Sequence, residues 1–380
     1  MEAKRNKDEN VVVGISQGDL NGIGYEVILK TFSDKRMFEF CSNVVYGSME
    51  VANYYSEKLE LPTIHLNAIK LTQDLVVGKL NILNLDEKGV KVEVGKSTQK
   101  AGEMALLALE YAVKDLKSKT IDVLVTAPIN KENIQSEKFK FPGHTSFLAK
   151  MFDTDNYLML MVQQDLRIGV ITDHIPLKDV ATTISKELII NKINILHESL
   201  GYDFAIRRPK IAILGLNPHA SDNGLIGDEE EKSIIPAIKQ AQKEGKFVYG
   251  PFSADGFFAS ENYKNFDAIL AMYHDQGLIP FKTLAFKNGV NFTAGLPIVR
   301  TSPAHGTAYE IAGKNEASSD SFRQAVYLAI DIFKNRQMQD EISQNPLLSS
   351  LKKMNQKAIQ DEDASDLLDL ISDKNEGIIF

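Results

Sequence analysis

The chain has 380 residues, of which 43% are apolar and 25% charged, and its formal net charge is -8 at pH 7. This length suffices for two or three domain-sized units, and the acidic balance argues against nucleic acid as a partner, because phosphate-backbone binding needs clustered positive charge. The single cysteine, Cys41, excludes an intrachain disulfide framework and a cysteine-based zinc site.

The hydropathy pattern indicates a protein without a membrane anchor. The first ten residues are charged and lead into a strand pattern, without the apolar stretch of a signal peptide. No run approaches the roughly 18 apolar residues of a membrane span. We therefore expect a cytoplasmic protein that does not contact a membrane.

The N-terminal part is predicted to form a strand, a glycine-rich turn and a helix. Residues 11–15 are mostly β-branched, residues 25–32 have a helical pattern, and Asp19, Gly22 and Gly24 lie between them. Such a turn lets backbone N–H groups approach an anion or a nucleotide. The glycines do not follow the G-x-G-x-x-G dinucleotide fingerprint, so a binding loop and a plain connection are both open.

Predicted strands and helices then alternate, which is typical of an α/β fold. The strand patterns cover residues 42–46, 80–85, 121–125, 157–162, 167–171, 210–216 and 266–272, and the helical patterns cover 101–116, 186–200 and 229–246. His144 and Thr145 precede another predicted helix, where the hydroxyl either caps the helix or contacts an anion. Asp255 is expected in a loop before the strand at 266–272.

Three histidines each follow an apolar strand pattern: His174, His219 and His274. Parallel strands would bring these three ends to one edge of a sheet. Neutral imidazoles bind Zn²⁺, Co²⁺, Mn²⁺ or Fe²⁺, and three ligands leave room for a substrate oxygen. The sequence contains no local metal motif, so a metal site and three separate polar contacts are both open.

The segment 271–308 holds the densest group of polar side chains, including Lys282, Asn291 and Arg300. Arg offers a planar fork of donors and Lys a mobile point charge, which suits a phosphate or a carboxylate. With a metal, this set would bind a small phosphorylated or carboxylated polyol. Alcohol oxidation by a nicotinamide and metal-dependent aldol cleavage or phosphate chemistry both fit.

The sequence closely resembles the 4-hydroxythreonine-4-phosphate dehydrogenase family of pyridoxal 5'-phosphate biosynthesis, from about residue 11 to residue 328. The motifs that carry the resemblance are GDLNGIGYE, PGHTSF, TDHIPLKDV, GLNPHASDNGLIGDEE, AMYHDQGLIPFK and GVNFTAGLPIVRTSPAHGTA. The chain departs from the family pattern at Leu20 and Tyr25, where prolines are usual, at Asp222 for glutamate, and at Ile226 for histidine.

The resemblance implies an α/β fold similar to isocitrate and isopropylmalate dehydrogenases, with two α/β/α domains and a cleft between them. The first would comprise residues 1–128 and 275–380, and the second 129–274. It also implies a homodimer whose active site lies at the subunit interface. The implied cofactors are NAD, or NADP, and a divalent metal, Zn, Mg or Co.

The resemblance also assigns roles to residues. His174, His219 and His274 match metal ligands, and the residues that match substrate contacts are His144, Thr145, Lys282, Asn291 and Arg300. Asp19, Gly22 and Gly24 are candidates for cofactor binding. His305 matches no ligand role and is expected to stabilise its loop or to lie near the nucleotide.

The implied reaction is the NAD-dependent oxidation of the C3 hydroxyl of 4-phospho-L-threonine, followed by loss of CO₂ to give 3-amino-2-oxopropyl phosphate. Asp255 and Asp275 are candidates for proton transfer or for binding the substrate's amino group. Within the family, 4-phospho-D-threonate and 4-phospho-D-erythronate are alternative substrates.

Overall fold

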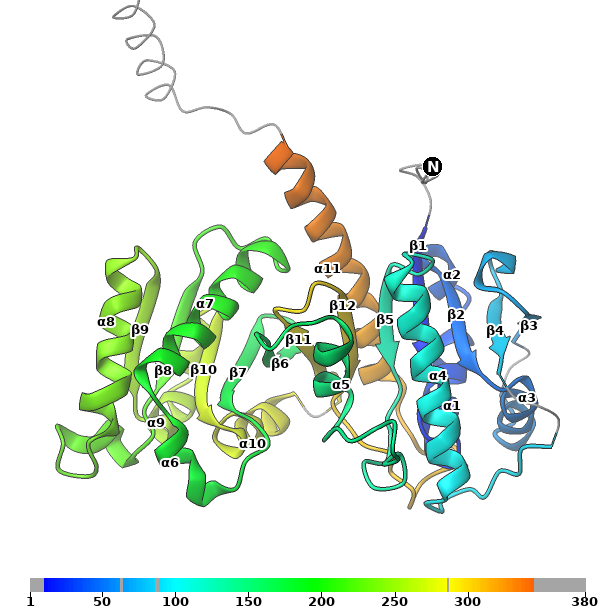
Figure 1. Cartoon of the computed structure of the whole chain (residues 1–380), viewed down its shortest axis with the longest axis horizontal. Helices are drawn as coiled ribbons and strands as arrows, with labels where there is room; N and C mark the ends of the chain where they lie inside the picture. Colours follow the sequence, from blue (N-terminus) through cyan, green and yellow to red (C-terminus); the bar gives the residue numbers. More distant parts are fainter. Residues whose placement is uncertain (1–9, 62–63, 86–88, 286, 345–380) are drawn as a thin grey trace, which may run out of the picture. The chain divides into compact units, whose positions relative to one another are not determined.

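The computed structural model describes residues 10–61, 64–85, 89–285 and 287–344 (Figure 1). Contacts within the chain divide it into two compact units, Met1–Arg336 and Gln337–Phe380. The sheet and all the pockets discussed below belong to the first unit.

The described residues form one twelve-stranded sheet with the order β3-β4-β2-β1-β5-β12-β11-β6-β7-β10-β8-β9. The strands are β1 (Val11–Ser16), β2 (Cys41–Gly47), β3 (Leu66–Ile69), β4 (Leu80–Asn84), β5 (Val123–Thr126), β6 (Leu158–Gln163), β7 (Leu166–Thr172), β8 (Lys210–Leu214), β9 (Phe247–Phe252), β10 (Ala268–Tyr273), β11 (Val290–Ala294) and β12 (Val299–Pro303). Strand β11 is antiparallel to β12 and β6, and β6 is antiparallel to β7, whereas the other neighbours are parallel.

Helices cover both faces of this sheet (Figure 1). They are α1 (Gly24–Phe32), α2 (Met37–Phe40), α3 (Met49–Lys58), α4 (Gln99–Lys117), α5 (His144–Met151), α6 (Val180–Thr183), α7 (Lys186–Tyr202), α8 (Ile235–Lys243), α9 (Ala254–Ala259), α10 (His274–Leu284) and α11 (Asp320–Gln344). Short 3₁₀ turns span Thr72–Asp74, Leu177–Asp179, Pro218–Asp222 and Asn262–Asn265, and a π-helical turn spans Glu230–Ile234.

Strand β1 shows how the sequence produces a sheet that is buried on both faces. Val13 and Ile15 pack in the cluster that contains α1 and α11, whereas Val12 packs in the cluster that contains α4. Successive strand residues point to opposite faces, so a strand covered on both sides needs a continuous apolar run. Burial of the sheet on both faces therefore explains the apolar strand patterns of the sequence.

The predicted α/β class is confirmed, and the strands that precede the three histidines are neighbours. Strand β10 lies between β7 and β8 and is parallel to both. His174, His219 and His274 therefore follow three adjacent parallel strands at the same edge of the sheet.

Two details of the predicted secondary structure are wrong. Asp255 lies in the first turn of α9 and not in a loop, and a carboxylate is favourable there because the helix N-terminus carries partial positive charge. The helix predicted at 229–246 begins with the π-helical turn, and α8 starts only at Ile235, one residue before Pro236. Proline is accepted in the first turn of a helix because it needs no N–H donor there.

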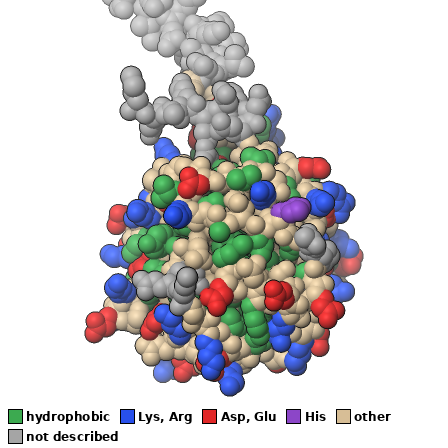
Figure 2. Space-filling model, turned by 90° about the vertical axis from the view of Figure 1, so that its right-hand side faces the viewer, with side chains coloured by type: hydrophobic (Ala, Val, Ile, Leu, Met, Phe, Trp, Pro, Cys, Tyr) green, Lys and Arg blue, Asp and Glu red, His purple; other side chains and the backbone are tan. Residues whose placement is uncertain are grey.

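On the face shown in Figure 2, Lys and Arg side chains are interspersed with Asp and Glu side chains, so this face carries no field of one sign. Within the described ranges, no helix is both long and apolar enough to cross a membrane.

Helix α4 packs closely on the turn that follows β5, and Gly102 makes this possible. A Cβ atom at Gly102 would lie 2.0 Å from the backbone oxygen of Asn133. We expect Gly102→Ala to lower the free energy of unfolding by about 1–3 kcal/mol, because backbone must move to admit the methyl group. Urea denaturation measures this change. Gly256→Ala in α9 is the matched control, since a Cβ there meets nothing within 4 Å; equal losses for both variants would contradict the packing argument.

Candidate active site

A cavity of about 250 Å³ opens where β5, β7 and β10 end. The helices α5 and α10 begin at its wall, with His144 and His274 as their first residues. Met159 and Met161 of β6 line the cavity from the sheet. Ligands of open α/β sheets bind at such strand ends, and we call this cavity the catalytic pocket.

The catalytic pocket collects most of the side chains predicted from the sequence. Its lining includes His144, Thr145, His174, His274, Lys282, Asn291 and Arg300. It does not include His219, Asp255, Asp275, Asp19, Gly22 or Gly24. The five residues matched to substrate contacts thus lie together with two of the three residues matched to metal ligands.

Arg300 brings a buried positive charge to the pocket. Its side chain on β12 is only 2% exposed, and its Nε and Nη2 atoms donate to Thr126 Oγ1 at 3.1 and 2.6 Å. In the part of the chain that the structure describes, Arg300 has no carboxylate partner, and burial lowers the pKa of its guanidinium to about 9. A buried ion without a counter-ion is costly, so an anionic ligand would be strongly favoured here.

Three further polar atoms around the pocket have no partner among the described residues. They are His144 Nε2, Asn291 Oδ1 and His305 Nε2, each buried and without a hydrogen bond. Burial, together with the charges of Arg300 and Lys131, holds the pKa of His144 well below 6.5, so its imidazole is neutral at pH 7. Buried polar atoms are nearly always paired, so these atoms are suited to a ligand or to ordered water.

His174 and His274 form a pair, with ring centroids 5.9 Å apart. Nδ1 of His274 lies 2.7 Å from Asp275 Oδ1, and Nδ1 of His174 lies 3.4 Å from Asp173 Oδ2. The hydrogen bonds to His174 lower the pKa of Asp173 to about 2. Carboxylates at Nδ1 leave Nε2 for another partner, as in metal sites where a carboxylate orients the ligand.

His219 follows β8 but lies in an unusual turn. Five consecutive residues, 219–223, have φ between 47° and 68°, the left-handed region, which costs about 1–2 kcal/mol per residue. Glu230, fully buried, accepts from the backbone N–H groups of Leu216 and Asn217, both at 2.8 Å, and so fixes the start of this turn.

These three histidines do not form a complete metal site within one chain. Across the described ranges, no three His, Cys, Asp or Glu side chains are arranged to hold a metal ion. The pair of His174 and His274 fits two ligands of such a site, and the remaining ligands would have to come from elsewhere.

The predicted acids lie outside the catalytic pocket. Asp255 is exposed, and a hydrogen bond from Ser253 lowers its pKa, with a smaller contribution from the charge of His219. Asp275 is also exposed and contacts His274.

The predicted cofactor loop is packed by the protein itself. Asp19 is fully buried and accepts from Tyr309 and Asn133, both at 2.7 Å. A Cβ at Gly22 would lie 2.8 Å from Thr307 O, and one at Gly24 would lie 2.5 Å from Gln17 O. These glycines therefore have a packing reason, and their role in cofactor binding stays a prediction.

Several lining residues were not predicted from the sequence, and three of them carry polar or charged groups close to the histidines and Arg300. These three are Thr126, Lys131 and Asp173, and the lining also includes His305, for which no ligand role was predicted. Lys131 Nζ lies 3.4 Å from His174 Nε2. The rule that strand ends carry ligand sites could have found Thr126 and Lys131, because both follow the predicted strand at 121–125.

We expect Arg300→Met to weaken the binding of inorganic phosphate more than about tenfold, because it removes the buried charge that lacks a counter-ion. Isothermal titration calorimetry measures the Kd, and the melting temperature should fall little, since no ion pair is broken. Arg207→Met, at an exposed arginine, is the control and should leave the Kd unchanged. Equal affinities of the wild type and Arg300→Met would exclude Arg300 as the anion contact.

Known proteins match this chain over most of its length. The family described as pyridoxal phosphate biosynthetic protein PdxA matches residues 39–329. A 4-hydroxythreonine-4-phosphate dehydrogenase from Bacteroides thetaiotaomicron is 52% identical over 342 residues, which are 90% of this chain and 94% of that protein.

Two further relatives also match this chain over most of its length and of their own. The crystal structure of a 4-hydroxythreonine-4-phosphate dehydrogenase from Klebsiella pneumoniae has a TM-score of 0.74 and 32% identity, covering 85% of this chain and 100% of that one. A protein from Oceanobacillus iheyensis with the provisional name D-threonate 4-phosphate dehydrogenase is 36% identical and covers 84% of this chain and 97% of its own length. The chain therefore belongs to the PdxA family of pyridoxal phosphate biosynthetic proteins.

Proposed function

We propose that this protein is an NAD-dependent dehydrogenase that oxidises 4-hydroxythreonine 4-phosphate in pyridoxal phosphate biosynthesis. The observation that carries the proposal is the buried Arg300, which has no counter-ion in the described chain and lies in one pocket with the histidine pair. The 52% identity to a relative named for this activity supports the substrate. NADP is the alternative cofactor.

The side chains of the catalytic pocket supply binding and orientation. Arg300 and Lys282 hold the anionic phosphate, and the buried atoms of His144 and Asn291 bind the polar groups that accompany it. A bound nicotinamide would supply the hydride acceptor for C3, whose hydroxyl loses its proton as it becomes a carbonyl. The resulting β-keto acid then loses its carboxylate as CO₂, and the electrons of the broken bond form an enolate.

A divalent metal, Zn, Mg or Co, would be held by His174 and His274, together with the partner subunit's His219. Such a metal lowers the pKa of a bound hydroxyl and stabilises developing negative charge on its oxygen. The donor set supports this assignment, because both histidines of the pair have a carboxylate at Nδ1. Asp255 and Asp275 stay candidates for proton transfer or for binding the amino group.

A homodimer with shared active sites would explain why His219 lies apart from the pair. A large apolar side chain within six residues after each histidine in the sequence is exposed. The exposed fractions are 72% for Leu177, 79% for Leu225 and 64% for Ile279. A second copy would remove this surface from water. The cytoplasm as location, and the division into domains 1–128 with 275–380 and 129–274, also stay proposals.

The second candidate is oxidation of D-threonate 4-phosphate, for which the relative from Oceanobacillus iheyensis is provisionally named. Contacts that hold a phosphate and a hydroxyl do not distinguish an amino group from a hydroxyl at C2. D-erythronate 4-phosphate is a further alternative on the same argument.

A direct test is NADH formation at 340 nm with 4-hydroxythreonine 4-phosphate and with the 4-phosphates of D-threonate and D-erythronate, each with Zn²⁺, Mg²⁺ or Co²⁺. We expect the highest kcat/KM with 4-hydroxythreonine 4-phosphate. A higher kcat/KM with the 4-phosphate of D-threonate or D-erythronate would favour that compound as the substrate. If no NADH forms with any of the three substrates, the proposed dehydrogenase activity is refuted.

Shared active sites predict that inactive variants complement each other. His219→Ala and His274→Ala should both be inactive, whereas their co-expressed mixture should recover about a quarter of wild-type activity, because half of the dimers are hybrids with one intact site. The matched control is the mixture of His174→Ala and His274→Ala, which should stay inactive because each of the two sites in the hybrid dimer carries one substitution. Activity in neither mixture would contradict the shared site.

A further inference from the structure

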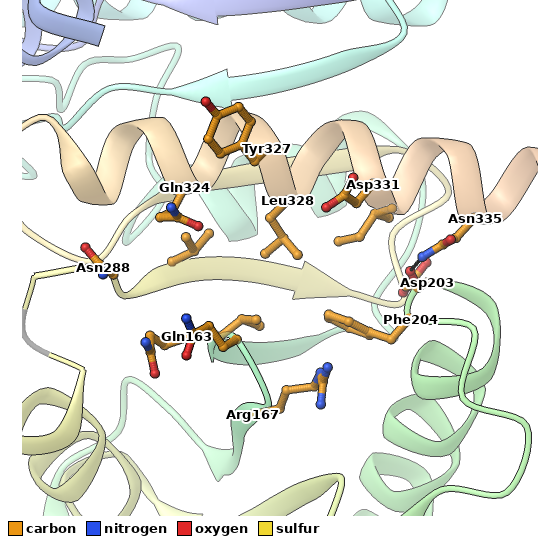
Figure 3. A pocket seen from close by; sticks show the side chains of 14 residues that line it. Gln163, Arg167, Asp203, Phe204, Asn288, Gln324, Tyr327, Leu328, Asp331 and Asn335 are labelled. Carbon is orange, nitrogen blue, oxygen red and sulfur yellow. Dashed lines mark hydrogen bonds between the residues drawn. The ribbon is translucent and has the colours of Figure 1, made fainter. Parts of the chain in front are cut away.

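A second cavity, of about 280 Å³, lies behind the strands that line the catalytic pocket (Figure 3). Val162 of β6 and Val290 of β11 line it, whereas their chain neighbours Met161 and Asn291 line the catalytic pocket. Because successive strand residues point to opposite faces, the two cavities lie back to back across these strands. The proposed reaction uses no residue of this second cavity.

The walls of the second cavity have an apolar part and a polar part. Val162, Val290, Leu328 and Ile332 form apolar wall from the sheet and from α11, and Phe204 extends it. The side-chain amides of Gln163, Gln324 and Asn288 lie around them (Figure 3). This combination suits a small amphipathic ligand.

One of the charged groups in the wall already has its partners. Asp203 is 2% exposed, its Oδ1 accepts from Arg336 Nε at 2.6 Å, and its Oδ2 accepts from Ser199 at 2.6 Å. The choice of ligand therefore depends on the two other charged groups, Arg167 and Asp331.

Arg167 keeps a buried hydrogen-bond donor that has no acceptor in the described part of the chain. Its side chain is 11% exposed, its guanidinium lies 4.7 Å from the ring centroid of Phe204, and Nη1 donates to the carbonyl groups of Asp165 and Asp267. The Nε atom is buried and has no hydrogen-bond partner. The exposed carboxylate of Asp165 lies 3.7 Å from Nη2. A carboxylate from the cavity would supply the acceptor that Nε lacks and a second counter-charge on the cavity side.

Asp331 faces the cavity from α11, on the side opposite Arg167 (Figure 3). No hydrogen bond or ion pair of Asp331 is found among the residues that the structure describes. Partial burial raises the pKa of this carboxylate, and the charge of Lys334 opposes that rise. An ammonium group is the complementary partner, because it has three donors and a positive charge.

We propose that the second cavity binds a free α-amino acid with an apolar side chain. The ammonium group pairs with Asp331, the carboxylate pairs with Arg167, and the side chain packs on the valines, Leu328 and Phe204. The ligand thus satisfies both charged groups at once, which neither an amine nor a carboxylic acid alone does. The inference of this site does not rest on the proposed dehydrogenase reaction.

The experiment is calorimetric titration of the full chain with L-leucine, and with isoamylamine and 4-methylpentanoate, which lack the carboxylate and the ammonium group. We expect saturable binding of L-leucine, and affinities at least about tenfold lower for both analogues. Asp331→Asn should weaken the binding of L-leucine about tenfold or more. Glu110→Gln, at an exposed carboxylate of α4, is the control and should bind as the wild type does.

Arg167→Met should also weaken binding, but Arg167 packs on Phe204, and the variant could lose stability. Asp331→Asn avoids this difficulty, because Asp331 is an exposed residue of α11. The variant Arg300→Met distinguishes the two cavities, because Arg300 lines only the catalytic pocket. If L-leucine binds in the second cavity, this variant should keep the wild-type affinity for it. The proposal is overturned by the absence of saturation up to about 10 mM, by equal binding of an analogue, by an unchanged Kd in Asp331→Asn, or by loss of binding in Arg300→Met.

Discussion

The buried positive charge of Arg300 is the constraint around which the catalytic pocket is built. Its guanidinium has the hydroxyl of Thr126 as a partner but no carboxylate in the described chain, although burying an ion without a counter-charge costs several kcal/mol. The fold tolerates this cost because β12 pairs with β5 on one side and β11 on the other, which fixes Arg300 beside Thr126. The same pairing sets Asn291 of β11 opposite Ser302, next to the same pocket.

The positive charge of Arg300 changes the pKa of the neighbouring His144. The charges of Arg300 and Lys131 add to burial in lowering the pKa of His144, so its imidazole stays neutral at pH 7 and can accept a hydrogen bond. A phosphate in the pocket would compensate both cations and reduce their effect on His144. The affinity for an anion and the protonation state of the imidazole are therefore linked.

Much of this site was predictable from the sequence because one rule places most of its parts. Apolar strands followed by His174 and His274 were recognisable, and the parallel neighbours β7 and β10 bring these ends together. The position of His219 was not predictable, since residues 219–223 adopt left-handed φ values that their side chains do not favour, and the turn begins where Glu230 binds the backbone of Leu216. Likewise, the packing of Asp19 was not predictable, because its hydrogen-bond partner Tyr309 lies 290 positions away in the chain.

The two cavities impose different demands on β6 and β11, because each strand must present a wall to both. At positions 290 and 291 the chain offers a valine to one cavity and an amide to the other, so a shift of β11 by one residue would exchange them and disrupt both. Antiparallel pairing of β11 with both neighbours fixes this register. A ligand that moved β11 from behind would therefore move Asn291 too, and any effect on substrate affinity would be matched by an equal effect of substrate on the affinity of that ligand.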